Sequence, residues 1–331
     1  MKGFDAEFRD LDHYIRAITA RIWEGGRVDD IHRYYSADCA VETPSSVSIG
    51  AAAVVAGTRS TLDEFPDRRL LAEDVVISGD EDGGFLSSHR IFSPMTHAGP
   101  GRYAAWPLGR TVYARTIADC VCIDNRIVHE WLVRDQGAIA LQLGLDERSL
   151  AQRWLNQSAG QTQPAMPPAP APYRSFIDPG SLAQGYAGAF GQLWGAGFGA
   201  AQALYDERVI SALPGGQTAC GRAVLGEFWH SLRAALRGAE FSVEHLVANA
   251  RNARSARNPR NSRATAIAMR WRVRASHDGA GRYGPPTGKP VQIMGISHAE
   301  VDHNGRVVRE WVLIDEIALW MQLLNPNEGV E

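Results

Sequence analysis

The stretch RIVHEWLVRDQGAIALQLG at residues 126–144 decides the fold, because a second version of it, RVVREWVLIDEIALWMQLL, occupies residues 306–324. Eight of the nineteen aligned positions are identical without a gap. A second match, HAGPGRY at 97–103 against HDGAGRY at 277–283, lies at the same shift of 180 residues. Two matches at one shift indicate a tandem duplication of a single structural unit.

The length of 331 residues also favours two domains. Between the two copies runs QSAGQTQPAMPPAPAP, residues 157–172, whose five prolines predict a semi-extended spacer without a packed core. We therefore predict a first domain at 1–155, a Pro/Ala-rich linker at 156–175 and a second domain at 176–331.

Each copy shows helical periodicity first and strand-like stretches afterwards. In copy one we expect helices at 10–24 and 51–65, strands at 70–78, 85–95, 111–123 and 126–134, and a last helix at 136–144. In copy two we expect helices from 182 and at 222–236, and strands at 241–248, 264–276, 290–301 and 306–314. Helices followed by a meander of antiparallel strands define an α+β fold. A bent sheet wrapped by helices leaves a concave apolar interior, the usual setting for a small-molecule site.

An aspartate closes the last strand of each copy. Because side chains alternate along a strand, Trp131 shares a face with Asp135, and Trp311 shares a face with Asp315. Burial on an apolar face raises the pKa of a carboxyl, and such a group can move protons near neutral pH. The same position, directly before a helix, is also that of an N-cap. The pattern alone leaves both interpretations open.

Histidine and tyrosine side chains at the strand ends are the other candidates. His277 shares a face with Trp271, and His97 is its counterpart in copy one. Either histidine suits a proton shuttle or substrate contact, or equally a structural role at a Gly-x-Gly turn. Tyr103 and Tyr283 suit hydrogen bonding to a developing oxyanion, or simply the wall of the pocket.

The remaining features exclude several classes of protein. The formal net charge of −3 gives no general attraction to nucleic acid, and the arginine-rich run at 251–263 lacks interleaved aromatic residues, so a solvated hairpin is expected there. The chain has no phosphate-binding glycine loop and no serine-nucleophile elbow. Its four cysteines are too scattered for a disulfide framework or a zinc set. The charged N-terminus and the absence of a long apolar run predict a cytoplasmic protein that contacts no membrane.

Several motifs resemble the SnoaL-like polyketide cyclases of the nuclear-transport-factor-2-like superfamily. The resemblance covers both copies and is strongest in copy two, on His277, Gly284-Pro-Pro-Thr-Gly-Lys289, Asn304-Gly-Arg306, Glu310-Trp311, Asp315 and Gln322-Leu323. It implies a cone-shaped α+β barrel in each copy, the two related by a pseudo-two-fold axis. It also implies that Asp135 and Asp315 act as acid/base groups in an intramolecular aldol cyclisation without metal or cofactor, with His97 and His277 at matching positions.

The chain departs from the family pattern at some positions. Copy one has Trp106-Pro-Leu-Gly-Arg110 in place of Pro-Pro-Thr-Gly-Lys, and His298 stands where the family often has arginine. His298 therefore joins Trp131, Trp271, Trp311, Tyr103 and Tyr283 as an expected pocket residue. Relatives of this fold commonly dimerise through their sheets, which implies an intrachain pseudo-dimer, with a further homodimer as an open alternative.

These observations lead to three hypotheses about function. The first is a cofactor-independent acid/base enzyme, a cyclase, isomerase or dehydratase, that acts on a small carbonyl-containing or polyketide-like substrate. The second is a noncatalytic small-molecule-binding or assembly module. The third is an epoxide or ester hydrolase on the same fold, for which the sequence shows no complete set of groups.

Overall fold

The structure is a computed structural model that describes residues 1–158, 164–250 and 264–326. The arginine-rich run at 251–263 lies outside the described residues. The chain divides into two compact units, Met1–Arg174 (unit 1) and Ser175–Glu331 (unit 2). The last helix of unit 1 ends at Ser158, so it extends into the predicted linker.

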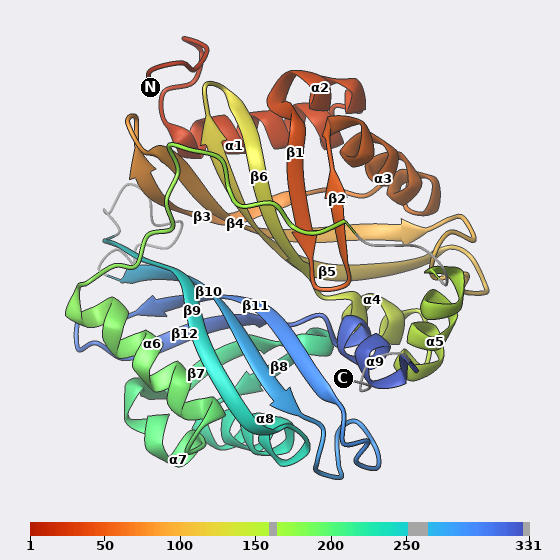
Figure 1. Cartoon of the computed structure of the whole chain (residues 1–331), viewed down its shortest axis with the longest axis vertical. Coiled ribbons are helices and arrows are strands. Elements are labelled where there is room, and N and C mark those ends of the chain that lie inside the picture. Colours follow the sequence, from red (N-terminus) through yellow and green to blue (C-terminus); the bar gives the residue numbers. More distant parts are fainter. Residues whose placement is uncertain (159–163, 251–263, 327–331) are drawn as a thin grey trace. The chain divides into compact units, whose positions relative to one another are not determined.

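Unit 1 has the predicted order of elements, with an additional hairpin and an additional C-terminal helix (Figure 1). Its helices are α1 (Leu11–Thr19), which continues as a π-helical turn (Ala20–Glu24), α2 (Ile31–Tyr34), α3 (Ala51–Glu64), α4 (Gln136–Gln142) and α5 (Glu147–Ser158). Its strands are β1 (Tyr35–Thr43), β2 (Ser46–Ile49), β3 (Leu71–Asp80), β4 (Gly84–His97), β5 (Arg110–Ile123) and β6 (Arg126–Arg134).

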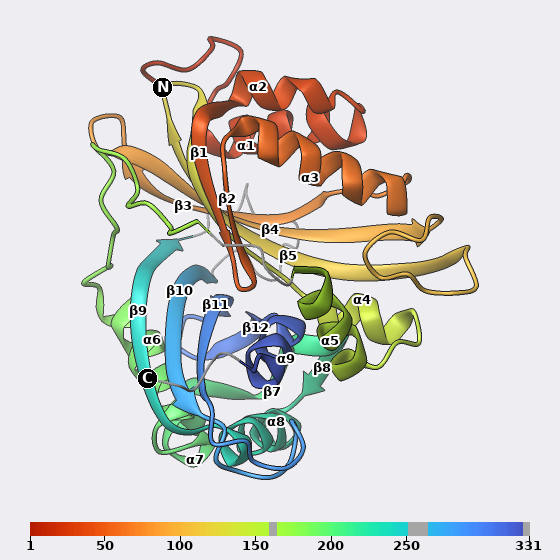
Figure 2. The same cartoon turned by 45° about the vertical axis from the view of Figure 1, so that its right-hand side comes forward.

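Unit 2 repeats this order. Its helices are α6 (Ser181–Trp194), α7 (Phe198–Ala201), α8 (Arg222–Ala235) and α9 (Glu316–Leu324). Its strands are β7 (Tyr205–Leu213), β8 (Gln217–Cys220), β9 (Arg237–Ala250), β10 (Thr265–Ser276), β11 (Pro290–Val301) and β12 (Val307–Leu313). Figure 2 shows the curved course of β9 beside α6.

The two sheets have the same topology, β2-β1-β6-β5-β4-β3 and β8-β7-β12-β11-β10-β9. The meander is antiparallel, whereas β1 pairs with β6, and β7 with β12, in parallel. The duplication extends to register, since Val41 faces Glu130 and Ser211 faces Glu310 across the parallel pair. The predicted α+β fold, two tandem domains each with a bent sheet and helices, is confirmed.

An amphipathic helix closes the concave face of each sheet (Figure 1). In unit 1, Asp10 accepts a hydrogen bond from the His13 amide and starts α1 as its N-cap. Leu11, Tyr14, Ile15 and Ile18 follow at helical spacing and are buried. They form one core with residues of β1, β5 and β6, so the inner face of the sheet is the one that faces α1.

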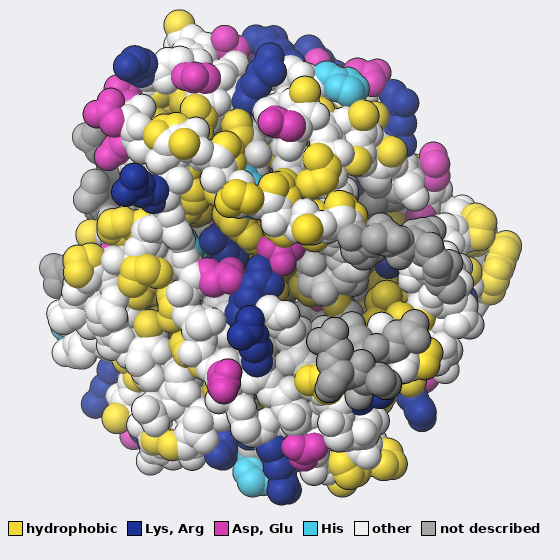
Figure 3. All heavy atoms as spheres, viewed as in Figure 1, with side chains coloured by type: hydrophobic (Ala, Val, Ile, Leu, Met, Phe, Trp, Pro, Cys, Tyr) yellow, Lys and Arg dark blue, Asp and Glu magenta, His cyan; other side chains and the backbone are white. Residues whose placement is uncertain are grey.

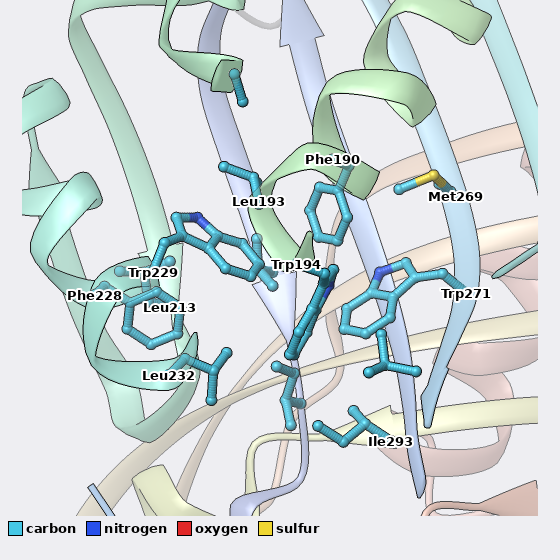
Figure 4. Packing of buried hydrophobic residues seen from close by; sticks show 14 of the residues in the cluster. Phe190, Leu193, Trp194, Leu213, Phe228, Trp229, Leu232, Met269, Trp271 and Ile293 are labelled. Carbon is cyan, nitrogen blue, oxygen red and sulfur yellow. The ribbon is translucent and has the colours of Figure 1, made fainter. Parts of the chain in front are cut away.

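The interior of unit 2 is filled by large aromatic side chains (Figure 4). Trp194 packs against Trp229 and Trp271 with ring centroids 5.5 and 5.6 Å apart, and Phe190 lies 5.2 Å from Trp271. The indole of Trp271 lies directly over Gly295 on the neighbouring strand, where a β-carbon would overlap its Cζ2 atom. A side chain at position 295 is therefore incompatible with this packing.

The surface mixes both signs of charge. Figure 3 shows lysine and arginine side chains interspersed with aspartate and glutamate over the visible face, in keeping with a net charge of −3. Among the described helices, none has the length and apolarity needed to span a bilayer.

Gly295→Ala should lower the free energy of unfolding of unit 2 by about 1–3 kcal/mol, because the new methyl group must displace the Trp271 indole in a filled core. Urea unfolding followed by near-ultraviolet circular dichroism measures this change. The matched control is Gly188→Ala on α6, where a β-carbon meets no atom within 4 Å and should stabilise the helix by up to about 1 kcal/mol. Equal stability of the two variants would contradict the packing described for Trp271.

Candidate active site

The last strand of each unit, β6 or β12, was expected to turn its tryptophan toward the interior. In the structure the opposite face of each strand lines the interior. On β6, Glu130 points toward the core under α1, so its neighbour Trp131 points away from it. On β12, Val312 belongs to the core of unit 2, so Glu310 is on the inner face and Trp311 on the outer one. His298 pairs directly with Trp311 and shares its outer face. This corrects the expectation that Trp131, Trp311 and His298 line an interior pocket.

The physical reason for this correction is that both faces of these strands are apolar and buried. Trp131 is only 9% exposed on the outer face, and a bulge in β6 lies between Ile127 and His129. Both faces therefore look like a core face, and alternation alone does not identify the one beneath α1.

The two predicted catalytic aspartates are buried helix caps. Asp135 Oδ1 accepts a hydrogen bond of 2.9 Å from the Ala138 amide and begins α4. Asp315 Oδ1 accepts hydrogen bonds from the amides of Ile317 and Ala318, at 3.0 and 3.1 Å, and begins α9. Both are 3% exposed, so neither lies in bulk water. The geometry accounts for them as N-caps, and their acid/base role stays a prediction.

His97 is enclosed at the end of β4 and belongs to a loop anchor. Its Nε2 atom lies 3.2 Å from Oε1 of Glu64, the last residue of α3. Glu64 also accepts hydrogen bonds from the backbone amides of Arg102 and Tyr103. Burial raises the pKa of Glu64, while these amides and His97 oppose that change. The cluster fastens the loop after β4 to α3.

His277 has a comparable place in unit 2. Its Nδ1 atom lies 3.1 Å from Thr287 Oγ1, and its carbonyl accepts hydrogen bonds from the amides of Thr287 and Gly288. Burial lowers the pKa of His277, which keeps the imidazole neutral near pH 7. These contacts fit the structural interpretation of a histidine at a turn.

The two tyrosines at the strand ends also contact the helices that follow the last strands. Tyr103 donates to the side chain of Gln136 on α4. Tyr283 donates to Glu316 on α9 at 2.9 Å, and Arg282 forms a bidentate ion pair with the same carboxylate. These hydroxyl groups fasten helices, whereas Trp271 forms part of the filled interior of unit 2.

The carboxyl groups that do face the two interiors are Glu130 and Glu310. Tyr35 donates a hydrogen bond of 3.1 Å to Glu130, whose side chain is otherwise removed from water. Burial raises the pKa of Glu130 to about 7, an effect that the Tyr35 hydrogen bond and the charge of Arg134 partly oppose. A carboxyl with this pKa exchanges protons at neutral pH, as a general acid or base requires.

In unit 2 the equivalent carboxyl is held by more donors. Glu310 accepts hydrogen bonds of 3.0 Å from both Tyr186 and Tyr205, and Ser211 lies 3.5 Å from its other oxygen. Burial raises its pKa to about 7 as well, with the hydrogen bonds acting in the opposite direction. Its oxygens are therefore already engaged within the protein.

Sequence reasoning missed these two residues, although the signal was present. Glu130 and Glu310 are identical across the repeat, and each interrupts the apolar run of its strand. On the same face of the strand, Glu130 is followed by Leu132 and Glu310 by Val312. An acid that recurs in both copies beside an apolar neighbour on its face indicates a buried carboxyl. The adjacent residues Trp131 and Trp311 are large and apolar, so the sequence pattern favoured their face of the strand as the inner one.

The inner wall formed by β4 differs chemically from that formed by β10. At the repeat shift of 180 residues, three polar side chains of β4 replace apolar ones of β10: Ser87 for Ile267, His89 for Met269 and Ser93 for Val273. All three polar residues are at most 2% exposed. Within the described part of unit 1, His89 Nε2 and Ser93 Oγ have no hydrogen-bond partner, and the Ser87 hydroxyl adjoins the weakly interacting thiol of Cys122.

Buried polar atoms without partners are costly, at about 1–3 kcal/mol each, and they cluster where a ligand or water supplies the missing bond. Burial, together with the positive charges of Arg16 and Arg90, lowers the pKa of His89 to about 3. The imidazole is therefore neutral at physiological pH and able to donate or accept a hydrogen bond. The interior of unit 1 thus combines a titratable carboxyl with neutral polar groups.

Unit 2 offers a different recess. A pocket of about 400 Å³ lies between the end of α6 and the start of β9, and its lining includes Trp194, His230, Arg233 and Arg237. Among the described residues that line this pocket, the buried indole N–H group of Trp194, on α6, has no hydrogen-bond partner. Across the described residues of both units, no cluster of three or more His, Cys, Asp or Glu side chains is arranged to hold a metal ion.

Comparison with known families gives two matches in tandem. The model of the SnoaL-like polyketide cyclases matches residues 13–143, and that of the SnoaL-like domain matches residues 189–310. The chain therefore belongs to the SnoaL-like polyketide cyclase family, as a protein with two domains of that family in one chain.

Three similar solved structures each correspond to less than half of this chain. A putative polyketide cyclase, IdmH from Streptomyces antibioticus, is 18% identical over 44% of this chain and 99% of its own, with a TM-score of 0.35. AclR from Streptomyces galilaeus, a putative hydroxylase, is 20% identical over 41% and 98%, with a TM-score of 0.35. A SnoaL-like polyketide cyclase from Agrobacterium tumefaciens is 21% identical over 41% and 99%, with a TM-score of 0.33. Comparison with curated proteins gives no match.

From the raised pKa of Glu130 we predict how the free energy of unfolding changes with pH. Because the pKa rises from 4.5 to about 7 on folding, the native state holds a proton that the unfolded state releases between these pH values. Stability is therefore lost as pH rises through this window, by up to about 3 kcal/mol at 1.36 kcal/mol per pKa unit. Glu130→Gln should raise the urea midpoint at pH 8 and lose this advantage at pH 4.5.

Glu24→Gln, at an exposed glutamate, controls for the loss of one negative charge. A Glu130→Gln protein that is less stable than the native chain at pH 8 would show that the ionised carboxylate is the favoured form in the folded state.

Proposed function

We propose that unit 1 is a cofactor-independent acid/base enzyme that acts on a small carbonyl-containing or polyketide-like substrate. The observation that carries this proposal is the buried Glu130 carboxyl on the inner face of β6, in a unit whose β4 wall presents His89 and Ser93 with unmet hydrogen-bonding capacity. Membership of the polyketide cyclase family supports the substrate class.

The proposed chemistry begins with proton transfer from carbon. The Glu130 carboxylate removes a proton from the carbon next to a carbonyl group, and the developing enolate oxygen accepts a hydrogen bond from the Tyr35 hydroxyl or from neutral His89. Glu130, now protonated, returns the proton to carbon or oxygen. Cyclisation, isomerisation and dehydration share this first step. The site therefore supports acid/base chemistry next to a carbonyl group, and the structure of the substrate determines which of the three products forms.

A second candidate function, a noncatalytic binding or assembly module, applies to unit 2. Its interior is occupied by Phe190, Trp194 and Trp271, and its carboxyl Glu310 already accepts hydrogen bonds from two tyrosines. This arrangement favours a filled scaffold over a reaction chamber. The pairing of the two units and a homodimer of the whole chain remain predictions.

Exchange of the proton next to the carbonyl can be measured without knowledge of the natural substrate. In D₂O, proton NMR should show exchange in 4-phenylbutan-2-one or levulinate above the buffer rate when the native chain is added. Glu130→Gln should reduce the protein-catalysed rate at least about 100-fold, in the range of acid/base contributions. Glu310→Gln, the same change in the other unit, should leave it within about twofold.

Asp135→Asn separates the two possible acids. The loss of the charged N-cap should cost about 1 kcal/mol of stability and leave the exchange rate within a few fold. If Asp135→Asn instead abolishes exchange while Glu130→Gln retains it, the acid/base role belongs to Asp135, as the family resemblance implies.

The exchange rate should also depend on pH through the carboxyl. Because the base is the ionised form and the pKa of Glu130 is about 7, the rate should rise as pH increases from 5 to 9, with a midpoint near 7. A profile of rate against pH for the native chain, with the buffer rate subtracted at each pH, checks this. A midpoint near 4 would contradict catalysis by a buried, desolvated carboxylate.

A further inference from the structure

The pocket of unit 2 lies beside the C-terminal half of α8 and has a volume of about 400 Å³. The buried residues of α8, among them Trp229 and Leu232, face the filled aromatic core. His230, Arg233 and Ala234 lie on the other side of this helix at helical spacing, and they line the pocket. A recess of this volume has the size of a small-molecule site.

The lining of the pocket is basic on one side and apolar on the other. Arg233, Arg237 and His230 supply nitrogen donors, and none of the described lining residues is aspartate or glutamate. Leu236 and the Trp194 ring supply apolar surface. The buried indole N–H of Trp194 has no hydrogen-bond partner among the described residues. This combination of groups is complementary to an anion that carries an apolar body.

One of the two arginines is held in place by the backbone. The Nε atom of Arg233 donates a hydrogen bond of 3.2 Å to the carbonyl of Trp194, and its Nη2 atom donates to the carbonyl of Gly195. These carbonyls lie at the C-terminal end of α6, where a cation is favourable. The charge of Arg233 is therefore fixed at the wall of the pocket by uncharged acceptors.

The duplication provides an internal comparison for this pocket. Helix α3 ends at Glu64 and α8 ends at Ala235. The carbonyls of these two residues accept hydrogen bonds from the amides of Gly99 and Gly279, which occupy equivalent places in the repeat. The two helix ends are therefore equivalent at a local shift of 171 residues (235 − 64 = 171).

At this shift the basic residues are specific to unit 2. Arg233 and Arg237 stand at the positions of an uncharged leucine and proline in unit 1, and Ala234 stands at the position of an aspartate. Five lining positions of unit 2 carry a formal charge of +2, whereas their counterparts carry +1 − 2 = −1. The positions compared are His230, Arg233, Ala234, Arg237 and Gly238 with Arg59, Leu62, Asp63, Pro66 and Asp67.

We propose that this pocket binds a small organic carboxylate, with the carboxylate at Arg233 and Arg237 and the apolar body against Trp194 and Leu236. The planar fork of a guanidinium group matches the two oxygens of a carboxylate. This inference gives a ligand class to the noncatalytic binding function proposed for unit 2 and rests on that function. It does not involve Glu130 or the reaction proposed for unit 1.

Isothermal titration calorimetry of the full chain with 2-naphthoate and its neutral amide, 2-naphthamide, tests the pocket. The acid should bind at least about tenfold more tightly than the amide, as expected for hydrogen bonds to a charged group. Arg237→Met should reduce this preference to within about threefold. The matched control is Arg208→Met, the same change at an exposed arginine of unit 2 outside the lining, which should keep the preference.

A second pair of variants tests the charge of the pocket without removing an arginine. Ala234→Asp introduces the acid that unit 1 has at this position, and Ala234→Asn introduces a neutral side chain of the same shape. The Asp variant should bind 2-naphthoate at least about tenfold more weakly than the Asn variant, because the added charge repels the carboxylate.

The outcomes distinguish this inference from the proposed reaction. Equal binding of acid and amide to the native chain, or detectable binding of neither, overturns the carboxylate site. Equal effects of Arg237→Met and Arg208→Met, or equal binding by the two Ala234 variants, overturn it as well, because the ligand would then bind elsewhere. Arg237→Met should leave the proton-exchange rate of unit 1 within about twofold, and Glu130→Gln should leave naphthoate binding unchanged, since the two sites are independent.

Discussion

The cost of a carboxyl group inside an apolar core is the constraint on which each unit depends. The last strand carries a glutamate on its inner face in both copies, and burial raises the pKa of each to about 7. Unit 2 meets the cost with hydrogen bonds from Tyr186 and Tyr205, which satisfy Glu310 within a closed core. Unit 1 supplies Glu130 with a hydrogen bond from Tyr35 and places the polar side chains of His89 and Ser93 on the β4 wall. One inherited feature thus serves packing in one copy and is available for chemistry in the other.

The divergence of the two interiors follows from a few substitutions on one wall. Trp271 fills the centre of unit 2, and it can do so only because its cross-strand partner is Gly295. At the corresponding pair in unit 1, Ile91 faces Thr116, so neither residue of this pair carries an indole. In unit 2, the large side chain of Trp271 on β10 packs over Gly295 on β11 and fills the interior. In unit 1, serine and histidine side chains on β4 make the corresponding wall polar.

Much of the fold could be predicted from the sequence, because the repeat and the periodicity of α1 and of the four meander strands are local patterns. The hairpin β1–β2 and helix α5 were not separated from their surroundings, since short elements give little periodicity. The orientation of β6 could not be predicted for a different reason. Trp131 and Glu130 alternate on a strand that is buried on both faces, and only the packing of α1 shows which of the two is inside.

The candidate site shows the same limit. The aspartates at the strand ends fitted both the pattern of a buried acid/base group and that of a helix N-cap. In the structure, Asp135 lies at the start of α4, where its Oδ1 atom accepts a hydrogen bond from the Ala138 amide. His89 on β4 could not be linked to Glu130 on β6 from the sequence, because no local motif connects these two strands, between which β5 lies in the sheet. Sites assembled from distant loops and strands depend on topology, which local patterns do not encode.

The uneven distribution of unsatisfied groups is itself an argument for function in unit 1. A domain is stable by only about 5–15 kcal/mol, and each buried polar atom without a partner costs about 1–3 kcal/mol. His89 and Ser93, together with the desolvated carboxyl of Glu130, therefore cost a substantial part of the stability of a domain. Met269 and Val273, which replace His89 and Ser93 in unit 2, show that the fold does not require polar groups on this wall. Polar groups that weaken the fold and gather around one interior are best explained by a ligand that completes them.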